Sequence, residues 1–124
     1  MRLSGQQFER LVSRAVKRLP PSVRRAMDNV DIVVEQRPRR EHLAAARVSR
    51  DETLLGLYQG VPLTSRGSAY SMVLPDKITI FQRPIEAACE TPEEIEERVR
   101  QVVLHELAHH FGMDEAALEE RGVG

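Results

Sequence analysis

The feature that most constrains this chain is a group of polar residues set into an otherwise apolar helical stretch. Residues 91–115 read TPEEIEERVRQVVLHELAHHFGMDE. Apolar side chains recur there at helical spacing, and the last turns are apolar on nearly every side, which predicts that they are buried. His105, Glu106 and His109 nevertheless lie in those turns. Buried imidazole and carboxylate groups are costly unless they are paired or bind a metal, so this placement requires a partner.

The start of this helix is marked by capping signals. Thr91 suits the N-cap, and Pro92 suits the first helical position, where no amide hydrogen is needed. Glu94 completes a T-x-x-E capping box, and the acidic first turn complements the helix dipole. Gly112 provides a C-cap where the backbone can turn sharply. We therefore expect one helix that begins near Pro92 and ends at Gly112.

The spacing of the two histidines indicates what their partner is. His105 and His109 are one turn apart, so their side chains lie about 40° from each other around the helix axis and can reach a single ion. Glu106 is too close in sequence to be an easy third ligand, but it can reach a metal-bound water. This is the H-E-x-x-H arrangement, in which two histidines hold zinc and the glutamate is a general base. The alternative is a pair of core histidines without metal, and the helical context favours the zinc site.

Composition mainly excludes other classes of protein. A length of 124 residues suits one domain, 1–124, with a single modest core. No apolar run has the length of a membrane span and no signal-peptide core is present, so we expect a cytoplasmic protein that does not engage a membrane. Cys89, the single cysteine, cannot form an internal disulfide and is interpreted as a packing residue.

Charge is unevenly distributed along the chain. Residues 1–50 carry 12 basic and 5 acidic residues, whereas residues 51–124 carry 6 basic and 14 acidic ones. Such asymmetry can mark a nucleic-acid-binding face. The basic residues are spread over a helix face and a loop without aromatic residues between them. We therefore favour a solvated surface that complements the acidic half over a surface that binds nucleic acid.

The rest of the chain supplies elements that can support the motif helix. An amphipathic helix is predicted to begin at a capping box formed by Ser4 and Gln7 and to end at Pro20. Short helical segments are predicted over residues 22–27 and 114–121. Three segments rich in β-branched or alternating residues are predicted to be strands: 30–35, 53–58 and 77–81.

Three connections are predicted between these elements. The weakly patterned stretch 41–51 is expected to be a loop with His42 at the surface. Glycine, proline and serine over residues 60–68 indicate a long irregular connection. Arg83 and Pro84 are expected to end the last strand before the motif helix begins.

The motif continues beyond the second histidine. His105, His109 and Gly112 match H-E-x-x-H-x-x-G-x-x-[H/D], in which the glycine breaks the helix so that a side chain three residues later can return to the metal. That side chain is Glu115 here, and a carboxylate is a competent zinc ligand. With this motif the chain resembles the metzincin-like branch of the zincin metallopeptidases. Asp114 is a rival ligand, because a one-residue change in the turn would exchange the two.

Over nearly its whole length the chain also resembles a family of short bacterial zincin-like metallopeptidases. The likeness is carried by LLGLYQGVPLTSRG (54–67), LPDKITIF (74–81) and VLHELAHHFGM (103–113). It implies an α+β, minimal zincin-like fold. In that fold a small mixed β-sheet packs on an N-terminal helix and on the H-E-x-x-H helix, which a short C-terminal helix follows.

Three neighbouring side chains are candidates for other roles at this site. His110 points about 100° away from His109, and we interpret it as supporting a ligand or packing against the sheet. Tyr58 and Tyr70 can each donate a hydrogen bond to an oxyanion. A buried structural role is the favoured interpretation for both tyrosines.

Two functions from different classes follow. The first is a zinc-dependent metallopeptidase acting on peptide or protein substrates: Glu106 is the general base, Zn²⁺ polarises the scissile carbonyl, and strand 77–81 pairs with an extended substrate. The second is a zinc-binding scaffold with little or no turnover, which suits the small size of the chain. Glu106 favours the enzyme, because a purely structural site needs no base and is normally closed by four protein ligands.

Overall fold

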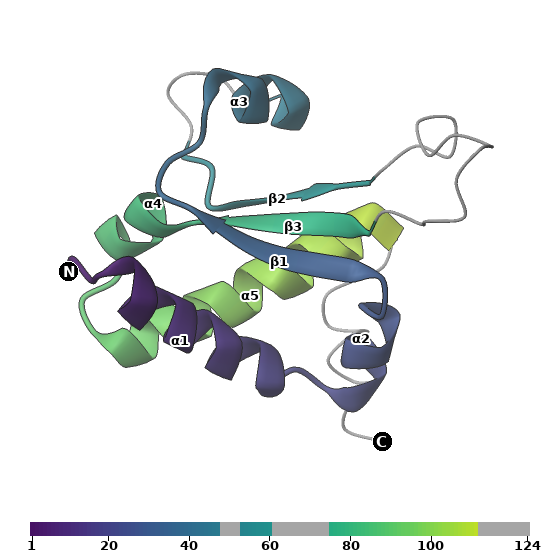
Figure 1. Cartoon of the computed structure of the whole chain (residues 1–124), viewed down its shortest axis with the longest axis horizontal. Helices are drawn as coiled ribbons and strands as arrows, with labels where there is room; N and C mark the ends of the chain where they lie inside the picture. Colours follow the sequence, from purple (N-terminus) through teal and green to yellow (C-terminus); the bar gives the residue numbers. More distant parts are fainter. Residues whose placement is uncertain (48–52, 61–74, 112–124) are drawn as a thin grey trace.

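The chain forms a small mixed sheet with two long helices against one of its faces (Figure 1). This computed structural model describes residues 1–47, 53–60 and 75–111. In these ranges the strands are β1 (Val30–Glu35), β2 (Gly56–Gln59) and β3 (Asp76–Phe81). Their order in the sheet is β1-β3-β2, with β1 parallel and β2 antiparallel to β3. The predicted strand 77–81 is therefore the central one.

Helices in the described part of the chain surround this sheet. They are α1 (Gly5–Lys17), α2 (Pro21–Ala26), α3 (Arg40–Ala46), α4 (Gln82–Ala87) and α5 (Pro92–Phe111). In Figure 1, α1 and α5 lie against the same face of the sheet, and α3 lies on the other side. The predicted α+β class, with a small mixed sheet on an N-terminal helix and a motif helix, is confirmed.

The start of α1 follows from its predicted capping box. The Ser4 hydroxyl accepts a hydrogen bond from the backbone N–H of Gln7 at 3.1 Å, and the Gln7 side chain accepts from the Ser4 N–H at 3.0 Å. The apolar stripe of α1 is buried: Phe8, Leu11, Val12 and Ala15. This helix therefore covers the sheet and α5, as its amphipathic pattern predicts.

One core joins the sheet to these two helices. Ile78 and Ile80 point into it from β3, and Phe8 enters it from α1. The buried face of α5 completes it with residues at helical spacing: Ile95, Val99, Val103 and Leu107. Cys89 is buried in the same cluster, which confirms its interpretation as a packing residue.

The stretch 41–51 is not simply a loop, because α3 occupies much of it. The backbone N–H of Arg39 donates to Nδ1 of His42 at 2.9 Å, which caps the start of α3. Nε2 of His42 lies 3.3 Å from a carboxylate oxygen of Glu35. The prediction of a surface histidine is therefore wrong: only 6% of His42 is exposed, and its ring nitrogens hold β1 and α3 together.

A second unpredicted helix, α4, follows directly on β3. Pro84 was expected to end the strand, but it lies in the first turn of α4, where its missing N–H costs nothing. Glu86 of α4 is buried and accepts hydrogen bonds from the backbone N–H of Leu3 and the guanidinium of Arg83, each at 2.7 Å. Burial favours the neutral acid, but these donors and Gln82 outweigh it and lower the pKa of Glu86.

Some of the remaining predictions of helices and strands lie within the described residues, and others lie outside them. The short helix over residues 22–27 is confirmed as α2, and β1 has the predicted bounds. β2 begins at Gly56, later than predicted. The predicted helix over 114–121 and most of the connection over 60–68 lie outside the described residues. No helix within the described ranges is long and apolar enough to cross a membrane.

Candidate metal centre

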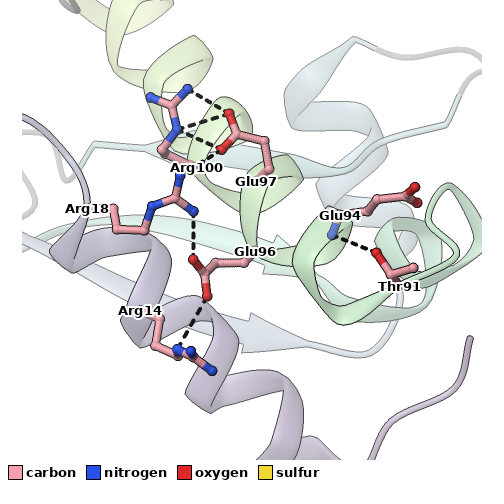
Figure 2. Close-up of polar contacts among 7 residues, drawn as sticks. All are labelled: Arg14, Arg18, Thr91, Glu94, Glu96, Glu97 and Arg100. Carbon is pink, nitrogen blue, oxygen red and sulfur yellow. Dashed lines mark hydrogen bonds and ion pairs between the residues drawn. The ribbon is translucent and has the colours of Figure 1, made fainter.

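The motif helix is held at its beginning by a cap. The Thr91 hydroxyl accepts from the backbone N–H of Glu94 at 3.1 Å, as predicted (Figure 2). The Glu94 carboxylate accepts from the backbone N–H of Glu90 at 2.7 Å, one residue before the expected partner. The first bond satisfies an amide that the first helical turn leaves without a partner, and the second ties Glu90, which precedes the helix, to that turn. Together they define where α5 starts.

A network of ion pairs then joins the first half of α5 to α1 (Figure 2). Arg18 lies 2.6 Å from a carboxylate oxygen of Glu96 and 3.2 Å from one of Glu97. Arg14 adds a 3.4 Å contact to Glu96, and Arg100 pairs with Glu97 at 2.7 Å. The hydrogen bond from Arg100 lowers the pKa of Glu97 against the opposing effect of burial. Carboxylates on this half of the helix are thus held in fixed positions.

The second half of α5 places the motif residues on its outer face. His105 and His109 are exposed, and Glu106 is partly buried. The expectation that these side chains are buried is wrong, because Leu104, Leu107 and other apolar residues turn toward the core and leave the opposite face open. Burial therefore does not require a partner for the histidines. Their shared face remains the reason to expect a common ligand.

The rings of the two histidines are arranged in a way that suits a metal ion. Their centroids are 6.3 Å apart, and the ring planes are inclined by 15°. With a zinc–nitrogen distance of about 2.0–2.1 Å, two imidazoles that share an ion have centroids up to roughly 6 Å apart. A centroid separation of 6.3 Å is close to that limit, and imidazole nitrogens are donors that zinc accepts. The two histidines therefore have the chemistry of zinc ligands.

Glu106 is held by the edge of the sheet. The backbone N–H of Tyr58 in β2 donates to its Oε1 at 2.9 Å. Among the described residues, no group bonds to the second carboxylate oxygen, Oε2. One oxygen thus fixes the side chain, and the other is available to act on a proton.

A cleft of about 610 Å³ opens beside these residues. It is lined by α5 and β2 and by the end of α3, including His105, Glu106, His109, Gly56 and Tyr58. β2 is an edge strand, and α5 contacts it closely: a Cβ at Gly56 would overlap Cγ1 of Val102. This glycine lets the strand approach the helix near the motif.

Tyr58 also ties β2 to β3 and to the end of α5. Its hydroxyl donates to Asp76 at 2.7 Å, and its ring stacks on His110 with centroids 3.8 Å apart. Burial, with the hydrogen bond and charge of Asp76, raises the pKa of Tyr58 to about 12. Tyr58 thus has a structural role, although its side chain is only partly buried, and the exposed ring of His110 packs on it. Tyr70 lies outside the described residues.

The predicted third ligand cannot be placed in this arrangement. Glu115 and its rival Asp114 both lie outside the described residues, so each stays a prediction. Within the described ranges, no three His, Cys, Asp or Glu side chains are close enough to hold an ion. The structure therefore brings together His105, His109 and Glu106 at one cleft, and the assignment of metal ligands rests on the motif.

Sequence reasoning missed three contributors to this site and chose the wrong strand for substrate pairing. The backbone of Tyr58 and the side chain of Asp76 hold Glu106 and β2, but backbone donors leave no signal in a sequence. The isolated glycine in a strand pattern at Gly56 was a usable signal, since it marks a close backbone approach. Strand 77–81 cannot pair with a substrate, because β1 and β2 occupy both of its edges.

The fold and site define a class, a small α+β domain with an H-E-x-x-H helix beneath an edge strand. A family model described as zincin-like metallopeptidase matches residues 27–124, and the chain belongs to this family. A solved structure of a conserved hypothetical protein from Thermo thermophilus is similar, with a TM-score of 0.58 and 22% identity over 88% of this chain and 94% of the other. That likeness concerns the fold. No curated protein matches the chain.

Proposed function

We propose that this protein is a zinc-dependent peptidase, in which His105 and His109 are metal ligands and Glu106 is the general base. One observation carries the proposal. The two imidazoles share an open face of α5 and line a cleft with Glu106, directly beside the edge strand of a sheet. Membership of the zincin-like metallopeptidase family supports the same chemistry.

The residues of the chain have distinct tasks in this proposal. When bound, zinc would polarise the scissile carbonyl and make the attacking water more acidic. Glu106 takes the proton of that water on Oε2 and passes it to the leaving amine. The bond from the Tyr58 N–H to Oε1 keeps the carboxylate oriented during both transfers. Glu106 thus acts as base and then as acid without moving from the strand.

The outer edge of β2 is the part of the sheet that suits an extended substrate. Successive residues of a strand direct their N–H groups to opposite edges. Because the N–H of Tyr58 faces α5, the backbone of Gly56, two residues earlier, faces the same way. The Tyr58 N–H is taken by Glu106, so a peptide would pair with the other outward backbone groups of this edge, and it would then lie along the cleft and across the two histidines. Proteins and peptides are therefore the substrates that we propose.

A zinc-binding scaffold is the second candidate function. It is favoured by the same hydrogen bond, since a glutamate engaged by the Tyr58 N–H also serves as a structural link between α5 and β2. The two candidates differ in what happens when Glu106 loses its basicity. A scaffold would keep both zinc and its full function, whereas a peptidase would lose turnover.

Metal analysis of single variants tests the proposed ligands. His105→Ala and His109→Ala should each abolish stoichiometric zinc, because two imidazoles on one face supply most of the described donor set. His110→Ala is the matched control: it removes an adjacent histidine that stacks on Tyr58 and should leave zinc in place. Full zinc occupancy in both ligand variants would exclude this site.

Glu106→Gln tests the proposed base. The amide keeps the shape and one acceptor oxygen but cannot take a proton, so zinc should stay while cleavage of a peptide library falls at least about a hundredfold. Loss of zinc in Glu106→Gln would make Glu106 a structural residue. Wild-type protein that holds zinc but cleaves no peptide in the library would favour the scaffold.

The third ligand needs its own comparison. We propose Glu115, so Glu115→Ala should weaken zinc binding strongly in competition with a chelator. Asp114→Ala should keep the metal and cost on the order of 1 kcal/mol, as expected for a lost helix cap. The opposite pattern would assign the ligand to Asp114.

A further inference from the structure

The cleft at the histidines continues along α5 toward the beginning of the helix. A second hollow of about 600 Å³ adjoins it, and Leu54, Gly56, His105 and Glu106 line both. Its far end is lined by Thr53 and by three polar side chains of α5: Arg98, Arg100 and Gln101. A peptide lying across the histidines would extend into this hollow.

The two arginines of the hollow differ in how their charge is balanced. Arg100 is paired with Glu97 at 2.7 Å. Arg98 is partly buried, and no carboxylate in the described ranges lies within ion-pair distance of it. Its guanidinium lies near the thiol of Cys89, whose pKa is raised by burial and is lowered again in part by this charge. A guanidinium offers five N–H donors, and a thiol is a weak acceptor, so most of them are available to an anion.

The distance from Arg98 to His105 along the helix determines which residue of a bound peptide could meet Arg98. Arg98 precedes His105 by seven residues, which is about two turns and about 10 Å along the helix. The two side chains lie about 20° apart around the axis, so they occupy one face. About 10 Å is the length of roughly three residues of extended peptide. An anion on the substrate would therefore meet Arg98 about three residues from the bond over the histidines.

We propose that this hollow is a carboxylate subsite, in which Arg98 binds a negatively charged group of the peptide about three residues to one side of the cleaved bond. The group is a carboxylate, supplied by an Asp or Glu side chain or by the C-terminus of the peptide. This inference rests on the proposed function, since it names the class of peptide that the same site prefers. Arg100 contributes little to it because Glu97 already neutralises its charge.

The test uses the full-length, zinc-loaded protein and three sets of matched peptides. One set carries a single Glu, scanned through each position of an otherwise neutral peptide with an amidated C-terminus. A second set replaces Glu with Gln, and a third has neutral side chains with a free C-terminus. We expect kcat/KM to be at least about tenfold higher for one Glu position, near three residues from the cleaved bond, or for a free C-terminus at that distance. The first and third sets distinguish the two sources of carboxylate.

Variants of Arg98 decide whether this side chain is responsible. Arg98→Gln should abolish the preference, so that this variant cleaves the Glu and Gln peptides with equal kcat/KM, and Arg98→Glu should favour Lys over Glu at the same position. Arg10→Gln removes an exposed arginine of α1 and should change neither value. Equal cleavage of acidic and neutral peptides by the wild type would overturn the proposal, as would a preference that survives in Arg98→Gln.

Peptide binding separates failure of the subsite from failure of the proposed function. Fluorescence anisotropy with labelled peptides needs no turnover and is measured on the wild type and Arg98→Gln. Tighter binding of carboxylate-bearing peptides that depends on Arg98 would uphold the subsite even if no peptide is cleaved. Active wild-type protein that binds acidic and neutral peptides equally would refute the subsite and leave the peptidase intact.

Discussion

The two ends of α5 differ in how their polar side chains are used. At the beginning of the helix, Glu96 and Glu97 are engaged by arginines of α1 and α5, and Ile95 and Val99 are fully buried. At the other end the histidines are exposed beside a cleft. Charged side chains at the first end hold elements together, whereas the histidines at the second end line a cleft.

The difference shows that one helix can both stabilise the fold and carry the candidate metal site. Its first half is fixed by core packing and ion pairs, and its second half presents exposed histidines beside the cleft. Glu106 is intermediate, since one of its oxygens is bound to β2 and the other is accessible. Substitutions at the two ends should therefore affect different properties, with stability lost at one end and ligand binding at the other.

The largest effect on stability is expected from Ile95→Ala. Ile95 is fully buried in the core, and truncating such a side chain costs about 2–5 kcal/mol. His109→Ala, measured by urea unfolding with a chelator present, should stay within about 0.5 kcal/mol of wild type. Ile95→Val, at about 0.5–1.5 kcal/mol, is the graded control. Equal losses of unfolding free energy in Ile95→Ala and His109→Ala would show that the two ends of α5 do not differ in this way.

The contact between β2 and α5 is tested at Gly56. A Cβ there would overlap Cγ1 of Val102, so Gly56→Ala should cost about 1–3 kcal/mol of unfolding free energy. The cost should shrink by at least about 0.5 kcal/mol in a Val102→Ala background, because that change creates space. A double-mutant cycle from urea denaturation measures this coupling. Additive effects would show that Gly56 is not needed for the close approach.

Glu86 is a buried carboxylate outside α5, and its contribution to stability depends on pH. Its pKa is lower in the folded chain than the ordinary value of 4.5, so its contribution is present above the unfolded pKa and is lost as pH falls through the folded one. Glu86→Gln should cost about 1.5–3 kcal/mol at pH 7 and should flatten the loss of stability below about pH 4.5. Urea midpoints from pH 7 to pH 3 measure both effects. Glu9→Gln, at an exposed position, is the control. If Glu86→Gln loses as much stability between pH 7 and pH 3 as the wild type does, Glu86 does not cause this pH dependence.

The smallest effect is expected from the ion pairs between α1 and α5. Glu96→Gln weakens the contacts to Arg14 and Arg18, which are partly exposed and therefore screened. The thermal midpoint should fall slightly at low salt, and the difference from wild type should vanish near 1 M salt. Thermal unfolding at two ionic strengths measures this. A salt-independent loss would mean that Glu96 acts through packing.

Local signals in the sequence predicted several elements well. The caps at Ser4 and Thr91 predict where α1 and α5 begin, because a cap acts within a few residues of itself. The helical spacing of apolar residues after each cap then predicts how far the helix runs. Pro84 misled the prediction of α4, since a proline ends a helix only when it stands beyond the first turn. α3 was missed because its cap uses the ring of His42, a residue type that carries little helix-start signal.

The shared helix face of the two histidines was predictable from the sequence, whereas the surroundings of that face were not. The spacing of His105 and His109 defines their shared face without any tertiary information. Which strand lies beside them depends on sheet order, and the alternation of residues 77–81 indicates a strand without indicating that it is the central one. The exposure of the histidines was misjudged because a count of apolar neighbours does not say which side of the helix they occupy.

The order of the strands has a further consequence for synthesis of the chain. β1 and β2 both leave the ribosome before β3, yet β3 is the strand that each of them pairs with. The sheet cannot close until residue 81 has emerged, and α5, which covers one face, is made later still. Such non-local pairing slows folding and leaves unpaired strand edges open to other chains in the meantime. The nascent N-terminal part should therefore depend on rapid completion of the chain, or on chaperones, to avoid aggregation.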